Sequence, residues 1–204
     1  MTANRIHWLG HASVLIEGEK NIYIDPWELE PGLPPADIIL VTHSHHDHCS
    51  RPDIEKISTP ETVIFAPPDC AECLPAGFRP VSPGIKTSVA GVGIETVPAY
   101  NIDKAFHPRK NNWVGYLVEM GGERIYHAGD TDYIPEMEQI GADTVLLPVG
   151  GTYTMDPEQA ARAADRIGAK LAIPIHYNRI VGSTSDAKRF RELTKIPVAI
   201  LPEE

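Results

Sequence analysis

Four potential metal ligands lie close together in the stretch Thr42-His43-Ser44-His45-His46-Asp47-His48. In an extended segment, His43 and His45 point to the same side and can share one cation. Asp47 and His48 follow where the chain must turn, so they can face a second cation. Imidazole and carboxylate ligands without thiolate suit zinc, manganese or iron. The alternative is a solvated histidine-rich loop, which four ligands in so short a stretch make much less favoured.

Two further candidate ligands each follow an apolar run later in the chain. Asp130 lies in Ala128-Gly129-Asp130-Thr131, and its carboxylate could bridge two cations. His176 ends the run Ile173-Pro174-Ile175. Alone, Asp130 would be interpreted as a turn or helix cap, and His176 as a hydrogen-bonded core histidine. All three motifs follow buried strands, however, and sites in α/β folds assemble at strand ends, so together they predict one metal site.

The elements that must position these residues can be read from apolar runs separated by 19 prolines and 16 glycines. The run 37–42 is apolar enough for a strand buried on both faces, and the histidine cluster begins where it ends. Gly121-Gly122 predicts a hairpin. Helices are predicted to begin at Ser50, Asp156 and Ser185. Further strands are predicted at 5–9, 14–17, 21–25, 62–66, 85–89, 93–97, 114–120, 123–127, 144–149, 171–175 and 196–201.

This order of strands and helices predicts an α/β sandwich, in which two mixed sheets pack together and helices cover the outside. The length of 204 residues is enough for one sizeable core. We therefore expect a single domain over residues 1–204, with two halves meeting near 90–100.

The composition limits the classes of partner. A net charge of -10 argues against a nucleic-acid surface, which needs clustered Lys and Arg, but a local metal site could still attract a small anionic substrate. No run is long enough for a membrane span, and residues 1–7 lack the apolar stretch of a secretory signal, so a cytoplasmic location is expected. Cys49, Cys70 and Cys73 are interpreted as free, structural thiols.

Over almost its whole length the chain resembles the metallo-β-lactamase superfamily. The motifs are the stretch 42–48, Tyr126-His127-Ala128-Gly129-Asp130-Thr131, Pro174-Ile175-His176-Tyr177, Leu9-Gly10-His11-Ala12-Ser13 and Ile24-Asp25-Pro26. They look like the branch of short metal-dependent hydrolases related to L-ascorbate-6-phosphate lactonase. The resemblance implies a four-layer αββα sandwich with two mixed sheets. It also implies a site for two divalent cations at one sheet edge, zinc first, with manganese or iron as alternatives.

The resemblance further implies a role for each motif residue. One cation would be bound by His43 and His45, the other by Asp47, His48 and His176, and Asp130 would bridge them. Family members supply a third histidine to the first cation after a mid-chain strand, where this chain has Asn101. We predict His107, six residues further along, as that ligand, with Asn101 or an open position as alternatives.

Other polar residues are expected around these ligands. His11 and Asp25 fit a supporting role, because metal-bound imidazoles commonly donate to an outer carboxylate or carbonyl. His46 is expected to point away from the site, and His127 to pack or to support. Substrate contacts are predicted, with ordinary loop surface as the alternative, for Tyr153, Tyr177, Asn178 and Arg109.

The predicted reaction is hydrolysis of a small-molecule ester, lactone or phosphodiester by a hydroxide held between two cations. Asp47 and Asp130 are the candidate catalytic residues. No G-x-S-x-G motif supports an acyl-serine route. The alternatives are an iron-dependent redox enzyme on the same scaffold, a nuclease or phosphodiesterase acting on nucleotides, and a non-catalytic metal-binding protein. Neither nucleic acid nor a membrane is expected as a partner, and a homo-oligomer is an open option.

Overall fold

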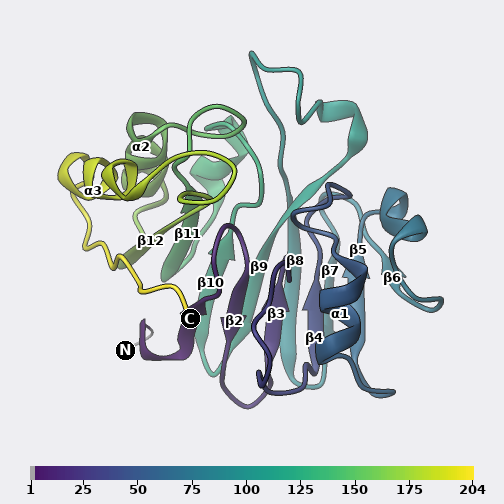
Figure 1. Ribbon diagram of the computed structural model, residues 1–204. Coiled ribbons are helices and arrows are strands. Elements are labelled where there is room, and N and C mark those ends of the chain that lie inside the picture. Colours follow the sequence, from purple (N-terminus) through teal and green to yellow (C-terminus); the bar gives the residue numbers. More distant parts are fainter. Residues whose placement is uncertain (1–2) are drawn as a thin grey trace.

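Two six-stranded sheets lie face to face in the computed structural model, which describes residues 3–204 (Figure 1). In spatial order, the first sheet contains β1 (Ile6–Trp8), β2 (Val14–Ile16), β3 (Ile22–Ile24), β4 (Ile38–Leu40), β5 (Val63–Ala66) and β6 (Arg79–Pro80). The second contains β12 (Leu171–Ile175), β11 (Thr144–Pro148), β10 (Glu123–His127), β9 (Val114–Met120), β8 (Val92–Pro98) and β7 (Lys86–Val89).

Both sheets are mixed. Strands β1 to β3 pair antiparallel and β3 to β6 pair parallel, whereas β7 to β10 pair antiparallel and β10 to β12 pair parallel. The α/β class and the two mixed sheets predicted from the sequence are therefore confirmed. The chain passes from the first sheet to the second between β6 and β7, at residues 80–86, slightly ahead of the expected 90–100.

Helices cover the outer faces. Helix α1 (Arg51–Ile57) packs on the first sheet, and α2 (Pro157–Ile167) and α3 (Thr184–Leu193) pack on the second (Figure 1). Asp156 caps α2 by accepting from the Gln159 N–H, and Gly168 ends it at a φ of 70°. Short 3-10 helices are η1 (Ala3–Arg5), η2 (Pro68–Glu72), η3 (Arg109–Asn111) and η4 (Pro135–Gln139). Over the described part of the chain, no helix is long and apolar enough to cross a membrane.

The core is divided by the first sheet into two apolar clusters. Ile38 and Leu40 of β4 point into the cluster between the sheets, whereas Ile39 and Val41 point into the cluster beneath α1. Because side chains alternate along a strand, burial of all four confirms the prediction of a strand buried on both faces. That burial fixes the strand whose end carries the histidine motif.

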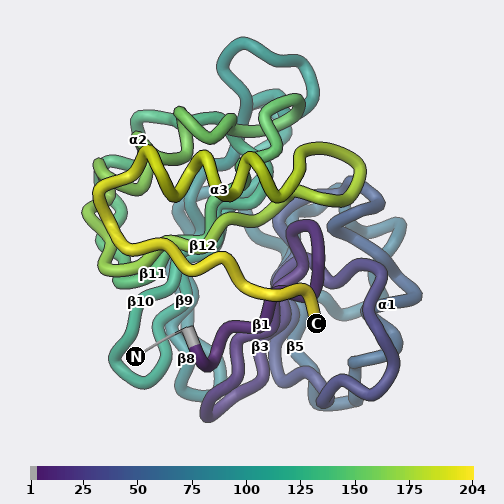
Figure 2. Tube along the Cα trace, turned by 60° about the vertical axis from the view of Figure 1, so that its left-hand side comes forward, coloured from purple at the N-terminus to yellow at the C-terminus, as the bar shows by residue number. Residues whose placement is uncertain are grey.

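The C-terminal segment does not form the predicted strand 196–201. Instead it joins the edges of both sheets through single bridges, from Val198 to Ala172 of β12 and from Glu203 to Trp8 of β1 (Figure 2). Pro197 and Pro202 lack the N–H that a continuous ladder needs, which explains why the pairing is interrupted.

Candidate metal centre

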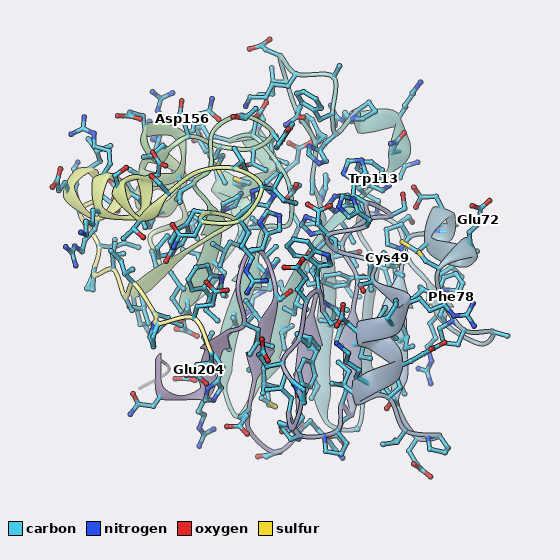
Figure 3. All side chains as sticks on the ribbon, viewed as in Figure 1. Cys49, Glu72, Phe78, Trp113, Asp156 and Glu204 are labelled. Carbon is cyan, nitrogen blue, oxygen red and sulfur yellow. The ribbon has the colours of Figure 1, made fainter. Side chains whose placement is uncertain are left out.

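The candidate ligands converge at one end of the two sheets, where strands give way to loops. In chain order, the sources are the β1–β2 loop (His11), the loop after β4 (His43 to His48), the β8–β9 loop (His107), the loop after β10 (Asp130) and the residue after β12 (His176). In Figure 3, Trp113 marks this end of the molecule, beside a group of nitrogen-bearing side chains. The two sheets thus contribute ligands to one site.

The first ligand group consists of His43, His45 and His107, whose ligand atoms all lie within 4.8 Å of one another. His43 Nε2 is 3.0 Å from His45 Nδ1. The Trp113 ring lies beside all three imidazoles, with centroid distances of 4.8, 4.9 and 5.6 Å respectively. This group is therefore a compact all-imidazole cluster with an apolar wall.

The second ligand group consists of His11, Asp47, His48 and His176, again within 4.8 Å of one another. His11 Nε2 lies 3.0 Å from Asp47 Oδ2, and the His11 and His176 rings are 3.9 Å apart. The sequence suggested only a supporting role for His11. Here it is placed as closely as the expected ligands, so it either holds Asp47 or binds directly.

Asp130 lies between the two groups. Its Oδ2 is 3.2 Å from His107 Nε2 and 3.1 Å from His176 Nε2, and its Oδ1 is 3.4 Å from His48 Nε2. This is the position required of a bridging carboxylate. Gly129 makes the approach possible, because its φ is 64° and an added Cβ would lie 3.1 Å from the Thr42 side chain.

Asp25 fixes the orientation of two imidazoles. Its carboxylate accepts from Thr42 Oγ1 at 2.7 Å, and Thr42 Oγ1 in turn accepts from His43 Nδ1 at 2.9 Å. The Asp25 carboxylate also accepts from His48 Nδ1 at 2.8 Å. When each ring is neutral and its proton is on Nδ1, the Nε2 atoms of His43 and His48 carry free lone pairs toward the site. Asp25 therefore occupies the supporting position expected of it.

The positions of His107 and Asn101 differ in what they face. His107 Nδ1 lies 3.2 Å from the Tyr153 carbonyl and 3.1 Å from Asn101 Oδ1, two acceptors, so Nδ1 is the protonated nitrogen. Its Nε2 is thus free and points at Asp130. Asn101 stands behind His107 and donates to Asp132 Oδ1 and the Tyr153 carbonyl. His107, rather than Asn101, therefore belongs to a group of side chains that could hold a metal ion.

The residues present fit divalent cations. The buried His48 Nε2, His107 Nε2, His176 Nε2 and Asp130 Oδ1 make no hydrogen bond. Asp25, Asp47 and Asp130 are buried carboxylates, and among the contacts of residues 3–204 none of them pairs with Lys or Arg. Buried charges need partners, and nitrogen and carboxylate ligands facing one another supply what zinc, manganese or iron bind.

The carboxylates keep their charge in spite of burial. Burial by itself would raise the pKa of Asp130, but the neighbouring His176 and His48 hold that pKa well below its usual range. For Asp47, burial is likewise outweighed by the hydrogen bond from His11, which lowers its pKa. Both groups are therefore ionised at neutral pH.

The histidines divide by their surroundings. Burial and the neighbouring His48 lower the pKa of His43, and burial and His107 lower that of His45. For His48, burial acts in the same direction, but Asp130 and Asp25 raise its pKa well above the ordinary value. Asp130 and Asp25, which favour the proton on His48, would also attract a metal cation that replaces this proton.

Two of the predicted substrate contacts, Tyr177 and Arg109, are engaged with other residues of the protein. Tyr177 is a correction: it is buried and stacked on Trp8 at 4.5 Å, so it packs the core and is closed to a substrate. Arg109 pairs with Glu136 at 2.9 Å and lies over the Tyr100 ring.

Two other predicted contacts remain accessible. Asn178 is exposed and accepts from Thr184, and the half-buried Tyr153 packs edge-on against Phe106 at 4.7 Å. His46 points outward as expected, with 82% of its side chain exposed.

Three residues that support the site were not predicted from the sequence: Asp69, Trp113 and Asp132. Asp69 accepts from Trp113 Nε1 at 2.7 Å and from Ser44 Oγ at 2.9 Å, so it ties η2 to the wall of the first ligand group. Asp132 accepts from Asn101 and Lys104. Nothing in the sequence around Asp69 or Trp113 signals these contacts, because 44 residues separate the two partners. Asp132 follows the Gly-Asp motif and is the one position that the motif could have indicated.

Comparisons with known proteins show which sequences this chain resembles. A family model described as a beta-lactamase superfamily domain matches residues 5–176. A metal-dependent hydrolase of Thermoplasma acidophilum is 34% identical, with 98% of this chain and 95% of that protein covered.

Solved structures are similar as well. One from Parabacteroides distasonis has a TM-score of 0.87 and 32% identity, covering 97% of this chain and 92% of its own. Igni18, a metallo hydrolase of Ignicoccus hospitalis, has a TM-score of 0.77 and 25% identity, covering 98% and 95%.

Proposed function

The chain belongs to the metallo-β-lactamase superfamily and is a metal-dependent hydrolase, and from this premise we propose that it cleaves an ester, lactone or phosphodiester bond of a small molecule. The observation that carries the proposal is the convergence of unpartnered nitrogen and oxygen atoms from both sheets on Asp130. Two groups of ligands with one carboxylate between them favour two cations, most simply zinc, over one.

The proposed division of labour follows from the contacts. His43, His45 and His107 would hold one cation, and Asp47, His48 and His176 the other, with Asp130 shared. Bound divalent cations lower the pKa of water toward neutrality and act as Lewis acids on a carbonyl or phosphoryl oxygen.

Asp47 is the residue best placed to orient the nucleophile. Its lowered pKa keeps it an acceptor, and His11 holds its Oδ2 in place, so its Oδ1 can accept a hydrogen bond from the attacking water. His46 Nδ1, 3.6 Å from that Oδ1, is exposed to solvent and can relay the proton outward.

A hydrolysis screen tests the proposal. Protein loaded with zinc or manganese would be assayed on p-nitrophenyl esters, simple lactones and bis(p-nitrophenyl) phosphate. We expect turnover of one class, loss of it on chelation and on Asp47→Ala, and a smaller loss in Asp69→Asn, because Asp69 contacts Trp113 and Ser44 rather than a ligand. No turnover in any class, or turnover that survives Asp47→Ala and Asp130→Ala, would overturn the proposal.

Analysis of the bound metals distinguishes the hydrolase from the iron-dependent redox alternative. Protein purified without added metal would be analysed for zinc, manganese and iron, and its oxygen uptake would be measured with a reductant. An iron-dominated site with oxygen uptake would replace hydrolysis by redox chemistry.

The proposal includes two statements about the surroundings of the enzyme. We place it in the cytoplasm, which the three thiols without a disulfide support. We also keep a small molecule, rather than nucleic acid, as the substrate, because the net charge of -10 disfavours binding of a polyanion.

A further inference from the structure

The exposed apolar side chains of this protein gather near the candidate metal centre. Four large apolar residues are exposed in the described chain: Ile85 at 40%, Ile102 at 56%, Phe106 at 48% and Ile180 at 56%. Ile102 and Phe106 lie in the loop that precedes His107, and Ile180 lies in the loop that leaves β12 after His176. Single exposed apolar residues are common, so the informative point is that three of the four flank one site.

The loop 101–107 is closed at its neck. The Asn101 N–H donates to the His107 carbonyl at 2.7 Å, and the His107 N–H donates to Asn101 Oδ1 at 3.0 Å. These reciprocal bonds hold the two ends of the loop together. In Figure 1 it projects beyond the strand ends, between β8 and β9.

The inner side of the loop is anchored by polar contacts. Asp132 accepts from the Ile102 N–H at 2.8 Å and from Lys104 Nζ, which also donates to the Thr154 carbonyl at 2.9 Å. A loop fixed at so many points presents its remaining side chains in one arrangement. A preorganised surface of this kind binds without a large ordering cost.

The outer side of the loop forms an apolar rim. Phe106 packs edge-on against Tyr153, with ring centroids 4.7 Å apart. Both residues are tied to the first ligand group, because Phe106 directly precedes His107 and the Tyr153 carbonyl lies 3.2 Å from His107 Nδ1. We call Ile102, Phe106 and Tyr153 the aromatic rim.

The two cations nearest in sequence to Phe106 are both paired with carboxylates. Lys104 is paired with Asp132, and Arg109 is paired with Glu136. These two cations are the nearest in sequence to Phe106, and both are already neutralised. The rim therefore offers apolar contact rather than charge to whatever it binds.

We propose that the aromatic rim selects substrates that carry an apolar alkyl or aryl group next to the bond that is cleaved. This inference rests on the proposed hydrolytic function, since it names the class of substrate for the same site. The rim adds the specificity, and the ligand groups hold the reacting end. A neutral ester with a medium-length acyl chain is the simplest such substrate.

The test measures binding of reaction products, so that it does not depend on turnover. Acetate, butyrate, hexanoate and octanoate would be titrated into zinc-loaded protein by calorimetry. Burial of the additional methylene groups is expected to make octanoate bind at least about tenfold more tightly than butyrate. Equal affinity along the series would overturn the inference, even if esters are hydrolysed. A clear trend without hydrolysis would leave the inference standing and count against the proposed function instead.

Variants of the rim residues test whether the rim causes the dependence of affinity on chain length. Phe106→Ser and Ile102→Ser are each expected to weaken octanoate at least about threefold while acetate stays unchanged, because acetate is too short to reach the rim. Phe106→Leu, which keeps an apolar group beside His107, should restore most of the affinity. Ile85→Ser is the matched control, exposed to a similar degree but on the edge away from the ligands, and it should change neither ligand.

One further outcome would assign the rim differently. Sedimentation velocity of the unliganded wild type and Phe106→Ser would show whether the rim is a contact between two copies of the chain. A wild-type dimer that dissociates in Phe106→Ser, together with no dependence on chain length, would overturn the substrate assignment. A trend with chain length that is the same in both oligomeric states would support it.

Discussion

The two ligand groups at the end of the sheets differ in charge. The first, His43, His45 and His107, consists of imidazoles alone and is closed on one side by Trp113. The second contains the ionised Asp47, and its His48 also donates to the buried Asp25. A cation in the second group therefore meets negative charge from several sides, whereas one in the first group depends on Asp130 for compensation.

This difference suggests that the two groups respond unequally to the same perturbation. The second group should bind a cation on its own, and it must release a proton to do so. The first group should need Asp130 but lose little when the pH falls. Four predictions test this contrast, in order of decreasing expected effect.

Asp130→Asn should have the largest effect. It keeps the shape of the side chain and removes the charge shared by both groups, so we expect hydrolysis to fall by at least about a hundredfold. Metal titration should show the weaker, first-group cation lost before the other. Asp143→Asn, a carboxylate that pairs with Lys170 outside the site, serves as the control. If both cations weaken equally, the two groups do not differ in their dependence on Asp130.

Removal of one imidazole from each group should leave one cation in place. His107→Asn should abolish binding at the first group and His176→Asn should weaken the second, and each lowers the metal content from two ions toward one. Asn is chosen because position 176 has a φ of 59°, which Asn tolerates. His46→Ala should retain both ions, since His46 faces solvent. Loss of both ions in either single variant would show that the groups are not separable.

The supporting residues should rank below the ligands. Asp25→Asn disturbs His48 directly and His43 through Thr42, so we expect metal affinity to fall by about 10- to 100-fold at both groups. Thr42→Val interrupts only the path to His43, and its effect should be smaller and limited to the first group. Calorimetric titration of the two variants against the wild type distinguishes these outcomes. An equal loss at both groups in Thr42→Val would contradict the assignment.

The smallest of the four expected effects is a difference between the two groups in how metal affinity depends on pH. The pKa of His48 is raised in the absence of metal, so a cation must displace its proton, and affinity at the second group should fall by up to about tenfold per pH unit below that raised pKa. The pKa values of His43 and His45 are lowered, so these two residues need release no proton near neutral pH, and affinity at the first group should depend less steeply on pH than affinity at the second. Calorimetry in buffers of different ionisation enthalpy counts the protons. Equal proton release at both groups would contradict this prediction.

Local patterns in the sequence predicted most of the fold. The boundaries of β9, β10 and β12 agree with the expected strands to the residue, because apolar runs and Gly121-Gly122 limit where a strand can begin and end. The predicted start of α2 at Asp156 is confirmed as well. The last strand was wrong, since apolar composition alone does not account for the N–H groups missing at Pro197 and Pro202.

The sequence by itself determined that four potential ligands, three histidines and one aspartate, stand at the end of a buried strand, and that Asp130 and His176 follow strands of their own. These properties depend on side-chain chemistry and on spacing of a few residues. Only the tertiary structure decided that His107 faces Asp130 while Asn101 stands behind it, that Tyr177 is buried on Trp8, and that Asp69 holds Trp113. Such contacts depend on how strand ends from two sheets meet, and pairing between distant segments leaves no local periodicity in the chain.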